Sequence, residues 1–131
     1  MLRKFRLALV AAIAMFWGLA VSLAGPNDYM FEPVNAQVKQ GDGVVVAVRL
    51  MHKKTRKPVT DAKIILKLID MSPDAMGEMR SQLTSLPSPE PGVYAFKTDL
   101  SMSGRWLLSI AAMVPRERQA VEKKIMFQAV R

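Results

Sequence analysis

Residues 61–80 read DAKIILKLIDMSPDAMGEMR, a run of alternating apolar side chains that leads into a methionine-rich turn. Side chains of a β-strand point alternately to opposite faces, so this pattern predicts a strand with one buried face. The predicted buried set comprises Ala62, Ile64, Leu66 and Leu68. Proline lacks an N–H, so Pro73 ends the strand, and Asp70 and Asp74 are expected to cap the turn by bonding to the backbone.

Similar short segments recur along the chain between glycine- and proline-rich turns. The predicted strands lie near residues 29–31 and over residues 44–51, 62–69, 78–86, 93–98, 105–113 and 120–130. About seven short strands, with no helical period after residue 26, predict an all-β fold, an immunoglobulin-like β-sandwich. Lys123 falls on the inward face of the last strand, which predicts either a bulge or an open edge at that point.

A basic and then apolar segment precedes these strands. Arg3, Lys4 and Arg6 lie before an uncharged run of 18 residues from Leu7 to Ala24. We expect residues 1–26 to form an apolar helix, either a cleaved signal peptide or a membrane anchor, and residues 27–131 to form the sandwich domain. The positive-inside rule then places the domain outside the cytoplasm, in the periplasm or at the outer face of the cytoplasmic membrane, anchored by residues 7–24 if they are retained.

The composition excludes several kinds of site. With no cysteine and a single histidine, His52, the chain cannot form disulfides, thiolate metal sites or a site of two imidazoles. The net charge is +8, and without the three N-terminal cations the other 16 basic and 11 acidic residues leave +5. This excess is spread along the chain, unlike a nucleic-acid-binding face, so we expect no nucleic-acid partner. No nucleophile–base pair or glycine-rich phosphate loop is legible, so we expect no enzymatic activity.

Two stretches carry a family resemblance: KPVTDAKIILKLIDMSPDAMGEMRSQL at residues 57–83 and PGVYAFKTDLSMSGRWLLSI at residues 91–110. The strand entry Lys-Pro-Val-Thr-Asp-Ala, the Asp-Met turn followed by Met-Gly, and the Pro-Gly-x-Tyr and Met-x-Gly-x-Trp strand starts resemble the YtkA-like family of exported bacterial β-sandwich domains. The resemblance covers about residues 36–112, and the turn of this chain has fewer methionines and prolines than is common in the family. It implies a domain at or beyond the cytoplasmic membrane, in some members beside heavy-metal transport systems, with an accessory or binding role.

The methionines of the central turn are candidate metal ligands. Met71, Met76 and Met79 cluster on that turn, and Met102 enters from a second turn. Thioether sulfur is a soft ligand that prefers Cu(I), a metal handled mostly outside the cytoplasm. If the four sulfur atoms converge, they predict a shallow Cu(I) site. The alternative is that these methionines fill irregular gaps at one end of a sandwich.

The connection HKKTRKP, at residues 52–58, is a candidate contact surface. The residues concerned are His52, Lys53, Lys54, Arg56 and Lys57. Each cation near an anionic membrane contributes about 1 kcal/mol, so we predict contact with lipid headgroups or an acidic partner. The alternative is an ordinary solvated loop. Four neighbouring cations disfavour metal binding by His52.

The sequence therefore favours an exported, non-enzymatic accessory or binding domain, with copper handling through the methionine-rich turn as its specific form. The competing hypothesis is a protein–protein adaptor that docks on a membrane complex, such as a transport or respiratory complex, without a metal. A purely structural envelope domain is a third alternative. Binding of Cu(I) separates the first hypothesis from the other two.

Overall fold

The computed structural model of the chain describes residues 26–131. The apolar segment at residues 7–24, predicted to be a signal peptide or an anchor, lies outside the described residues. A short 3-10 helix, η1 (Pro26–Asp28), opens the described chain. Within residues 26–131, no helix is both long enough and apolar enough to cross a membrane.

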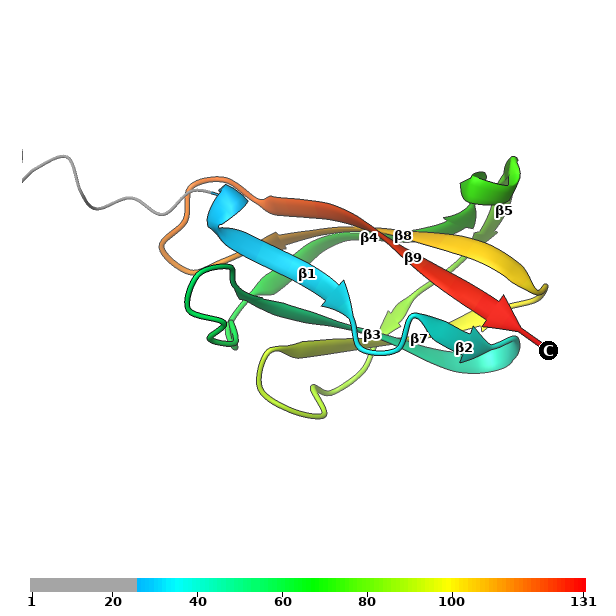
Figure 1. The fold of residues 1–131 in the computed structure, drawn as a ribbon, viewed down its shortest axis with the longest axis horizontal. Coiled ribbons are helices and arrows are strands. Elements are labelled where there is room, and N and C mark those ends of the chain that lie inside the picture. The colour runs from blue at the N-terminus through cyan, green and yellow to red at the C-terminus, as the bar shows by residue number, and fades with distance from the viewer. Residues whose placement is uncertain (1–25) are drawn as a thin grey trace, which may run out of the picture.

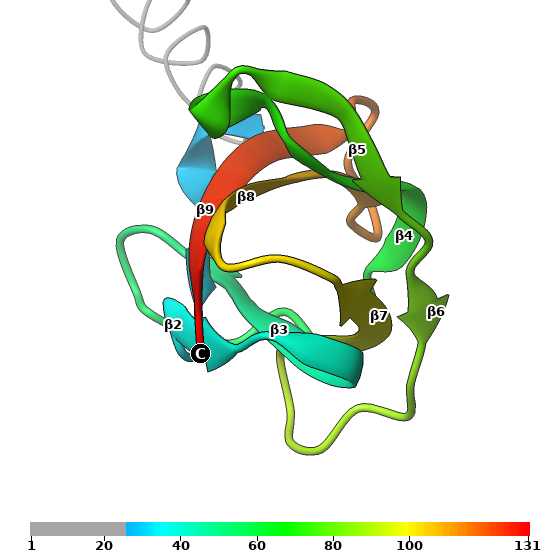
Figure 2. The same ribbon diagram turned by 90° about the vertical axis from the view of Figure 1, so that its right-hand side faces the viewer.

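Residues 26–131 form nine strands in two stacked sheets (Figure 1). The four-stranded sheet has the order β1 (Tyr29–Pro33), β3 (Gly41–His52), β7 (Val93–Leu100) and β6 (Thr84–Ser85). The five-stranded sheet has the order β2 (Gln37–Lys39), β9 (Val121–Val130), β8 (Gly104–Met113), β4 (Lys63–Met71) and β5 (Met76–Ser81). Viewed along the strands, β9, β8 and β4 curve over β3 and β7 (Figure 2). The predicted all-β, immunoglobulin-like sandwich is confirmed.

Two strand predictions differ from the structure. The strand expected over residues 78–86 is divided between the sheets, because β5 pairs with β4 and β6 pairs with β7. The strand β2 was not predicted, and it runs parallel to β9 with Val38 opposite Ala129. Its three residues are too few to show an alternating pattern in the sequence.

A β-bulge after Ile64 reverses the faces of β4. Ile64 is opposite Ala112 of β8, but Leu66 is opposite Ala111, so β4 carries one extra residue at this point. Beyond the bulge, Leu66 is 51% exposed whereas Ile69 is fully buried. The predicted buried set of Ala62, Ile64, Leu66 and Leu68 is therefore wrong in its second half. One inserted residue exchanges the inner and outer faces of a strand.

The hydrophobic core lies between the sheets and, among the described residues, extends in sequence from Tyr29 to Ala129. Its largest fully buried side chains are Trp106, Phe96 and Phe127. Each fully buried large apolar side chain contributes about 1.5–3 kcal/mol, so this core can stabilise a domain of about 100 residues. Because both inner faces are complete within residues 26–131, we expect this segment to fold on its own.

Lys123 of β9 is exposed at an open edge of the five-stranded sheet. The neighbouring strand β2 covers only Gln128–Val130 of β9, and β8 pairs with β9 without a register shift. Of the two alternatives predicted for Lys123, the structure has the edge and not the bulge.

Candidate functional site

The methionine-rich turn forms one end of the sandwich, where a second 3-10 helix, η2 (Ser72–Asp74), connects β4 to β5 (Figure 1). The Asp70 Oδ1 accepts a hydrogen bond from the Ser72 N–H at 2.9 Å, which is the predicted capping contact. Hydrogen bonding from Ser72 lowers the pKa of Asp70. Ala75 ends η2 in the left-handed region, with φ of 58°, and its N–H donates to the Ser72 carbonyl at 3.0 Å. These local bonds define the shape of the turn.

Asp74 joins this turn to the start of β8. Its carboxylate accepts hydrogen bonds from the backbone N–H and from the Nε of Arg105, each at 2.7 Å. The Nη2 of Arg105 also donates to the Pro73 carbonyl at 2.6 Å. The bond from the backbone N–H, followed by that from the guanidinium, lowers the pKa of Asp74. The predicted backbone contact of Asp74 therefore exists, but it is made to a neighbouring segment and not within its own turn.

Met71 lies on the inner side of this end and has no exposed surface. It is the register partner of Met76 across the β4–β5 connection. The Met71 Cε lies beside Gly104, so that a Cβ built on Gly104 would be 2.7 Å from it. Met71 is thus part of the core, as the gap-filling alternative predicts, and it packs directly against the start of β8.

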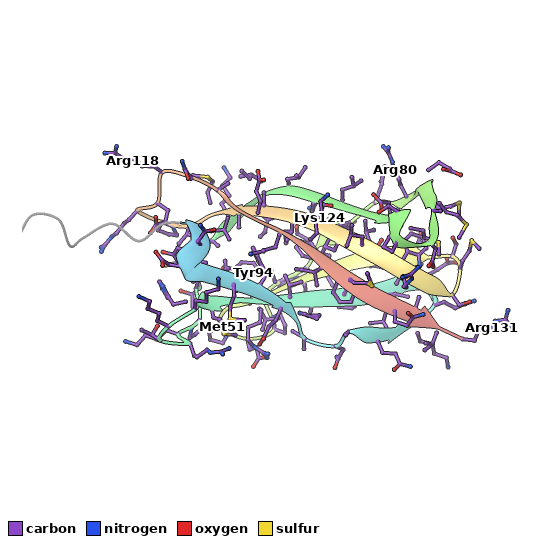
Figure 3. All side chains as sticks on the ribbon, turned by 45° about the horizontal axis from the view of Figure 1, so that its top comes forward. Met51, Arg80, Tyr94, Arg118, Lys124 and Arg131 are labelled. Atoms are coloured by element: carbon purple, nitrogen blue, oxygen red, sulfur yellow. The ribbon has the colours of Figure 1, made fainter. Side chains whose placement is uncertain are left out.

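The other three predicted ligands are more accessible. Met76 and Met79 on β5 are partly buried and pack against the core, while Met102, between β7 and β8, is 39% exposed. The Met102 carbonyl accepts a hydrogen bond from the Trp106 Nε1 at 3.1 Å, which holds the loop backbone. We name the end of the sandwich that carries Met71, Met76, Met79 and Met102 the methionine end. Sulfur atoms are visible at this end of the domain in Figure 3.

The loop with the four cations of residues 53–57 connects β3 to β4 and lies at the end of the sandwich opposite the methionine end. It is closed by two hydrogen bonds of 2.9 Å, from the His52 N–H to the Lys57 carbonyl and from the Arg56 N–H to the His52 carbonyl. Arg56 has a positive φ of 60°, as expected in a tight turn. Lys53, Lys54, Arg56 and Lys57 are all exposed. The His52 ring is half-buried, with its centroid 4.8 Å from that of Tyr29.

Sequence reasoning missed a second basic loop at this same end, between β8 and β9. Arg116 and Arg118 are exposed there, and Arg118 lies opposite the end that carries Arg80 (Figure 3). Glu117 between them accepts a hydrogen bond from the Tyr29 hydroxyl at 2.9 Å. Burial, followed by this bond to Glu117, raises the pKa of Tyr29 to about 12. The segment PRER at residues 115–118 has the mixed charges of an ordinary surface turn, so nothing in the sequence indicates that it lies near the first basic loop.

A family model described as YtkA-like matches residues 23–111, which is more than half of the chain. The chain belongs to the YtkA-like family. The match includes β4, the methionine-rich turn and the loop of Met102, so the resemblance inferred from these motifs is confirmed. No curated protein matches the sequence. Among solved structures, the ZirS C-terminal domain is similar, with a TM-score of 0.45 and 12% identity over 86% of this chain and 75% of that chain.

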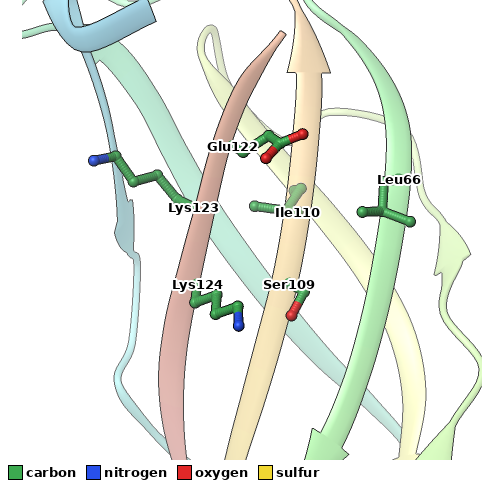
Figure 4. A pocket seen from close by; sticks show the side chains of 6 residues that line it. All are labelled: Leu66, Ser109, Ile110, Glu122, Lys123 and Lys124. Atoms are coloured by element: carbon green, nitrogen blue, oxygen red, sulfur yellow. The ribbon is translucent and has the colours of Figure 1, made fainter.

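The outer face of the five-stranded sheet of this YtkA-like domain carries a shallow pocket of about 340 Å³ (Figure 4). Its lining residues are Leu66, Ser109, Ile110, Glu122, Lys123 and Lys124. Leu66 reaches the pocket because the bulge in β4 turns it outward. Met126 on β9 is also 47% exposed, so this sheet exposes apolar side chains as well as the charged Glu122 and Lys124. Within residues 26–131, no group of three or more His, Asp or Glu side chains is arranged to hold a metal ion.

Proposed function

We propose that this YtkA-like domain is an exported, non-enzymatic accessory domain that binds Cu(I) at its methionine end. The main support is that the fold brings two methionine-bearing segments, the β4–β5 turn and the β7–β8 loop, to one end of the sandwich. These segments are tied by Asp74 and Arg105, so their separation is limited by the fold. Membership of the YtkA-like family supports the accessory binding role. The copper ligand is our extension of that role.

The chemistry of these side chains suits a soft, monovalent ion. Thioether sulfur is uncharged and polarisable, so a site built from it favours Cu(I) over hard divalent cations. Met76 and Met79 are partly buried and Met102 is 39% exposed, so three thioethers lie at or near the surface, while Met71 lies buried beside Gly104. A methionine side chain has three rotatable bonds, so its sulfur can turn toward an ion without a change in the backbone.

The test is a titration of residues 26–131 with Cu(I) in competition with a chromophoric chelator. We expect a single strong site. The combined substitution Met76→Leu, Met79→Leu and Met102→Leu should weaken it by at least about tenfold, equivalent to about 1.4 kcal/mol. Leucine conserves the volume of methionine, so each substitution should cost less than about 1.5 kcal/mol of stability. The fold of the variant can be checked by circular dichroism.

Met126→Leu provides the matched control, because Met126 is an exposed methionine on β9 outside the methionine end. Its Cu(I) affinity should equal that of the unmodified domain. Met71→Leu reports whether the buried sulfur takes part in the site. If the domain fails to compete with the chelator, or if the triple variant binds as tightly as the Met126→Leu control, the copper hypothesis is rejected.

The adaptor hypothesis is favoured by a different observation, the outer face of the five-stranded sheet. Leu66 and Met126 are exposed on this face, and the pocket also carries the charged side chains of Glu122 and Lys124, a combination of apolar and charged groups typical of a surface that binds a partner protein. Under this alternative, Leu66→Asp should abolish co-purification with a membrane complex and leave the Cu(I) titration unchanged. The two hypotheses therefore predict different variants to be defective.

A further inference from the structure

A second candidate surface lies at the end of the sandwich opposite the methionine end. It combines the exposed cations of two loops, Lys53, Lys54, Arg56, Lys57, Arg116 and Arg118. We name this surface the basic end. About 60 residues of sequence separate the two loops, so only the fold places their charges together. None of these residues belongs to the proposed copper site.

Contacts of Tyr29 and Asp28 hold the two loops in fixed positions. The Tyr29 hydroxyl donates to Glu117 of the second loop, while its ring packs against His52 of the first loop with centroids 4.8 Å apart. The Lys53 N–H donates to the Asp28 carbonyl at 2.8 Å, which ties the first loop to η1. The basic end is therefore a built surface of the domain, positioned by a buried tyrosine that is 3% exposed.

The charges of the basic end are not neutralised locally. The two loops and η1 together carry six cations and three carboxylates, those of Asp28, Asp61 and Glu117, which leaves a net charge of +3. The carboxylate of Glu117 already accepts a hydrogen bond from the Tyr29 hydroxyl. Among the salt bridges within residues 26–131, which involve Arg49 and Arg105, none includes a cation of the basic end. These cations are available to an anionic partner.

The chain itself indicates which anionic partner this is. The described chain begins at η1, and η1 contacts the first basic loop through the bond between Lys53 and Asp28, at the end of the domain shown at the left of Figure 1. The apolar run of the sequence ends at Ala24, two residues before Pro26. A residue of extended chain spans at most about 3.6 Å, so an apolar run held in a bilayer would keep the basic end within reach of the headgroups.

We propose that the basic end rests on anionic lipid headgroups and thereby holds the methionine end away from the bilayer. Each cation near an anionic membrane contributes about fivefold to binding, and the attraction decays over a Debye length of about 8 Å at physiological salt. The long axis of the sandwich separates the two ends (Figure 1). An orientation set in this way presents the methionine end to partners outside the membrane.

The first test measures binding of residues 26–131 to vesicles by sedimentation, with vesicles of phosphatidylcholine alone and with about 30% phosphatidylglycerol added. We expect binding only to the anionic vesicles, weakened by salt. In the variant Lys53→Gln, Lys54→Gln, Arg118→Gln, the affinity for anionic vesicles should fall about 100-fold, because each cation contributes about fivefold. These positions are exposed and lack a positive φ, so the fold should persist.

A control variant removes the same number of charges elsewhere, with Lys39→Gln, Lys97→Gln and Arg131→Gln, all exposed residues outside the basic end. It should bind anionic vesicles nearly as well as the unmodified domain. An equal loss in both variants would mean that only net charge matters, which overturns the proposal. Absence of binding to anionic vesicles also overturns it, as does binding to an acidic polypeptide such as polyglutamate in preference to the vesicles.

The second test measures orientation and uses the absence of cysteine from the chain. Thr55→Cys places one label on the first basic loop, and Ser103→Cys places one beside Met102 at the methionine end. With an environment-sensitive fluorophore attached, the Thr55→Cys domain should show a blue shift on anionic vesicles and the Ser103→Cys domain should not. Equal shifts at both labels would reject the orientation. Neither test involves copper, so its outcome is independent of the proposed function.

Discussion

Asp74 and Arg105 connect the two segments of the methionine end through two hydrogen bonds of 2.7 Å, although they are 31 positions apart in sequence. Asp74 lies in η2 before Met76, and Arg105 follows the loop that carries Met102. Gly104 allows this approach, because a Cβ at that position would lie 2.6 Å from the Asp74 Oδ2. The pair therefore positions Met102 of the β7–β8 loop relative to Met76 and Met79, which follow η2 on β5.

The first prediction concerns the pH dependence of this connection. Hydrogen bonds from Arg105 lower the pKa of Asp74 below its ordinary value of 3.8. A carboxyl group whose pKa is lowered by folding stabilises the fold above its unfolded pKa, and the contribution is lost as the pH falls through its folded pKa. Asp74→Asn should therefore lower the urea midpoint at neutral pH, and its difference from the unmodified domain should shrink well below pH 3.8.

Glu78→Gln is the control for this prediction. Glu78 is an exposed carboxylate on β5 for which no hydrogen bond or ion pair is found among residues 26–131. Glu78→Gln should leave the urea midpoint equal to that of the unmodified domain both at neutral pH and at a pH well below 3.8. A constant difference between Asp74→Asn and the unmodified domain across the acid range would contradict the assigned pKa direction.

The second prediction separates the buried methionine from the exposed one. Met71 is fully buried, so Met71→Ala should leave a cavity and destabilise the domain by about 2–5 kcal/mol. Met102 is 39% exposed, and its hydrogen bond to Trp106 uses only the backbone, so Met102→Ala should change stability by less than about 0.5 kcal/mol. Urea unfolding measures both values. Similar costs for the two variants would show that their burial differs less than described.

The fold was predictable because the alternation of side chains along a strand is a local property of the chain. Trp106 and Phe127, for example, indicate which faces of β8 and β9 are buried. The face of Leu66 was not predictable, since it depends on one inserted residue that only the pairing of β4 with β8 reveals. The parallel strand β2 was missed for a related reason. Its three residues take their conformation from β9 and carry no pattern of their own.

The candidate site was predictable where its residues are contiguous in sequence. The four cations of residues 53–57 lie together in the sequence, so the sequence alone predicts them as a candidate contact surface, and that role stays a prediction. Arg116 and Arg118 join them only through the contacts of Tyr29 with Glu117 and His52, which cross between strands distant in sequence. The burial of Met71 likewise depends on the bulge in β4. Without the extra residue, Met71 would point to the outer face of the sheet and Asp70 would point into the core.

The third prediction concerns Tyr29, whose pKa is raised to about 12 by burial and by its bond to Glu117. A raised pKa means that folding favours the neutral phenol, so this contribution is complete below pH 10 and is lost as the pH rises from 10 toward 12. Tyr29→Phe removes the hydrogen bond and should cost about 1 kcal/mol at neutral pH. Its urea midpoint should then fall less steeply than that of the unmodified domain above pH 10.

Glu117→Gln tests the cause of this shift. It retains an acceptor for the Tyr29 hydroxyl but removes the negative charge, so the pKa of Tyr29 should fall toward its ordinary value while burial still keeps it raised. Ultraviolet absorbance of the phenolate follows this titration, and Tyr94→Phe simplifies the signal because Tyr94 is the other tyrosine of the chain. An unchanged pKa in Glu117→Gln would show that the negative charge of Glu117 does not contribute to the shift.

The last prediction compares two glycines in different surroundings. Gly92 follows the proline-rich turn with φ of 81°, and a Cβ there would lie 2.5 Å from the Pro58 Cβ and 3.2 Å from the Leu50 carbonyl oxygen. Gly92→Ala should therefore destabilise the domain by roughly 2–5 kcal/mol, from left-handed backbone strain together with overpacking. A Cβ on Gly77 would meet only the Ser72 Cβ at 3.9 Å, an ordinary contact, without a positive φ. Gly77→Ala should be neutral or stabilising by up to about 1 kcal/mol, because alanine restricts the unfolded chain. Equal urea midpoints for the two variants would show that the connection between β3 and β4 can move away from Gly92 at little cost.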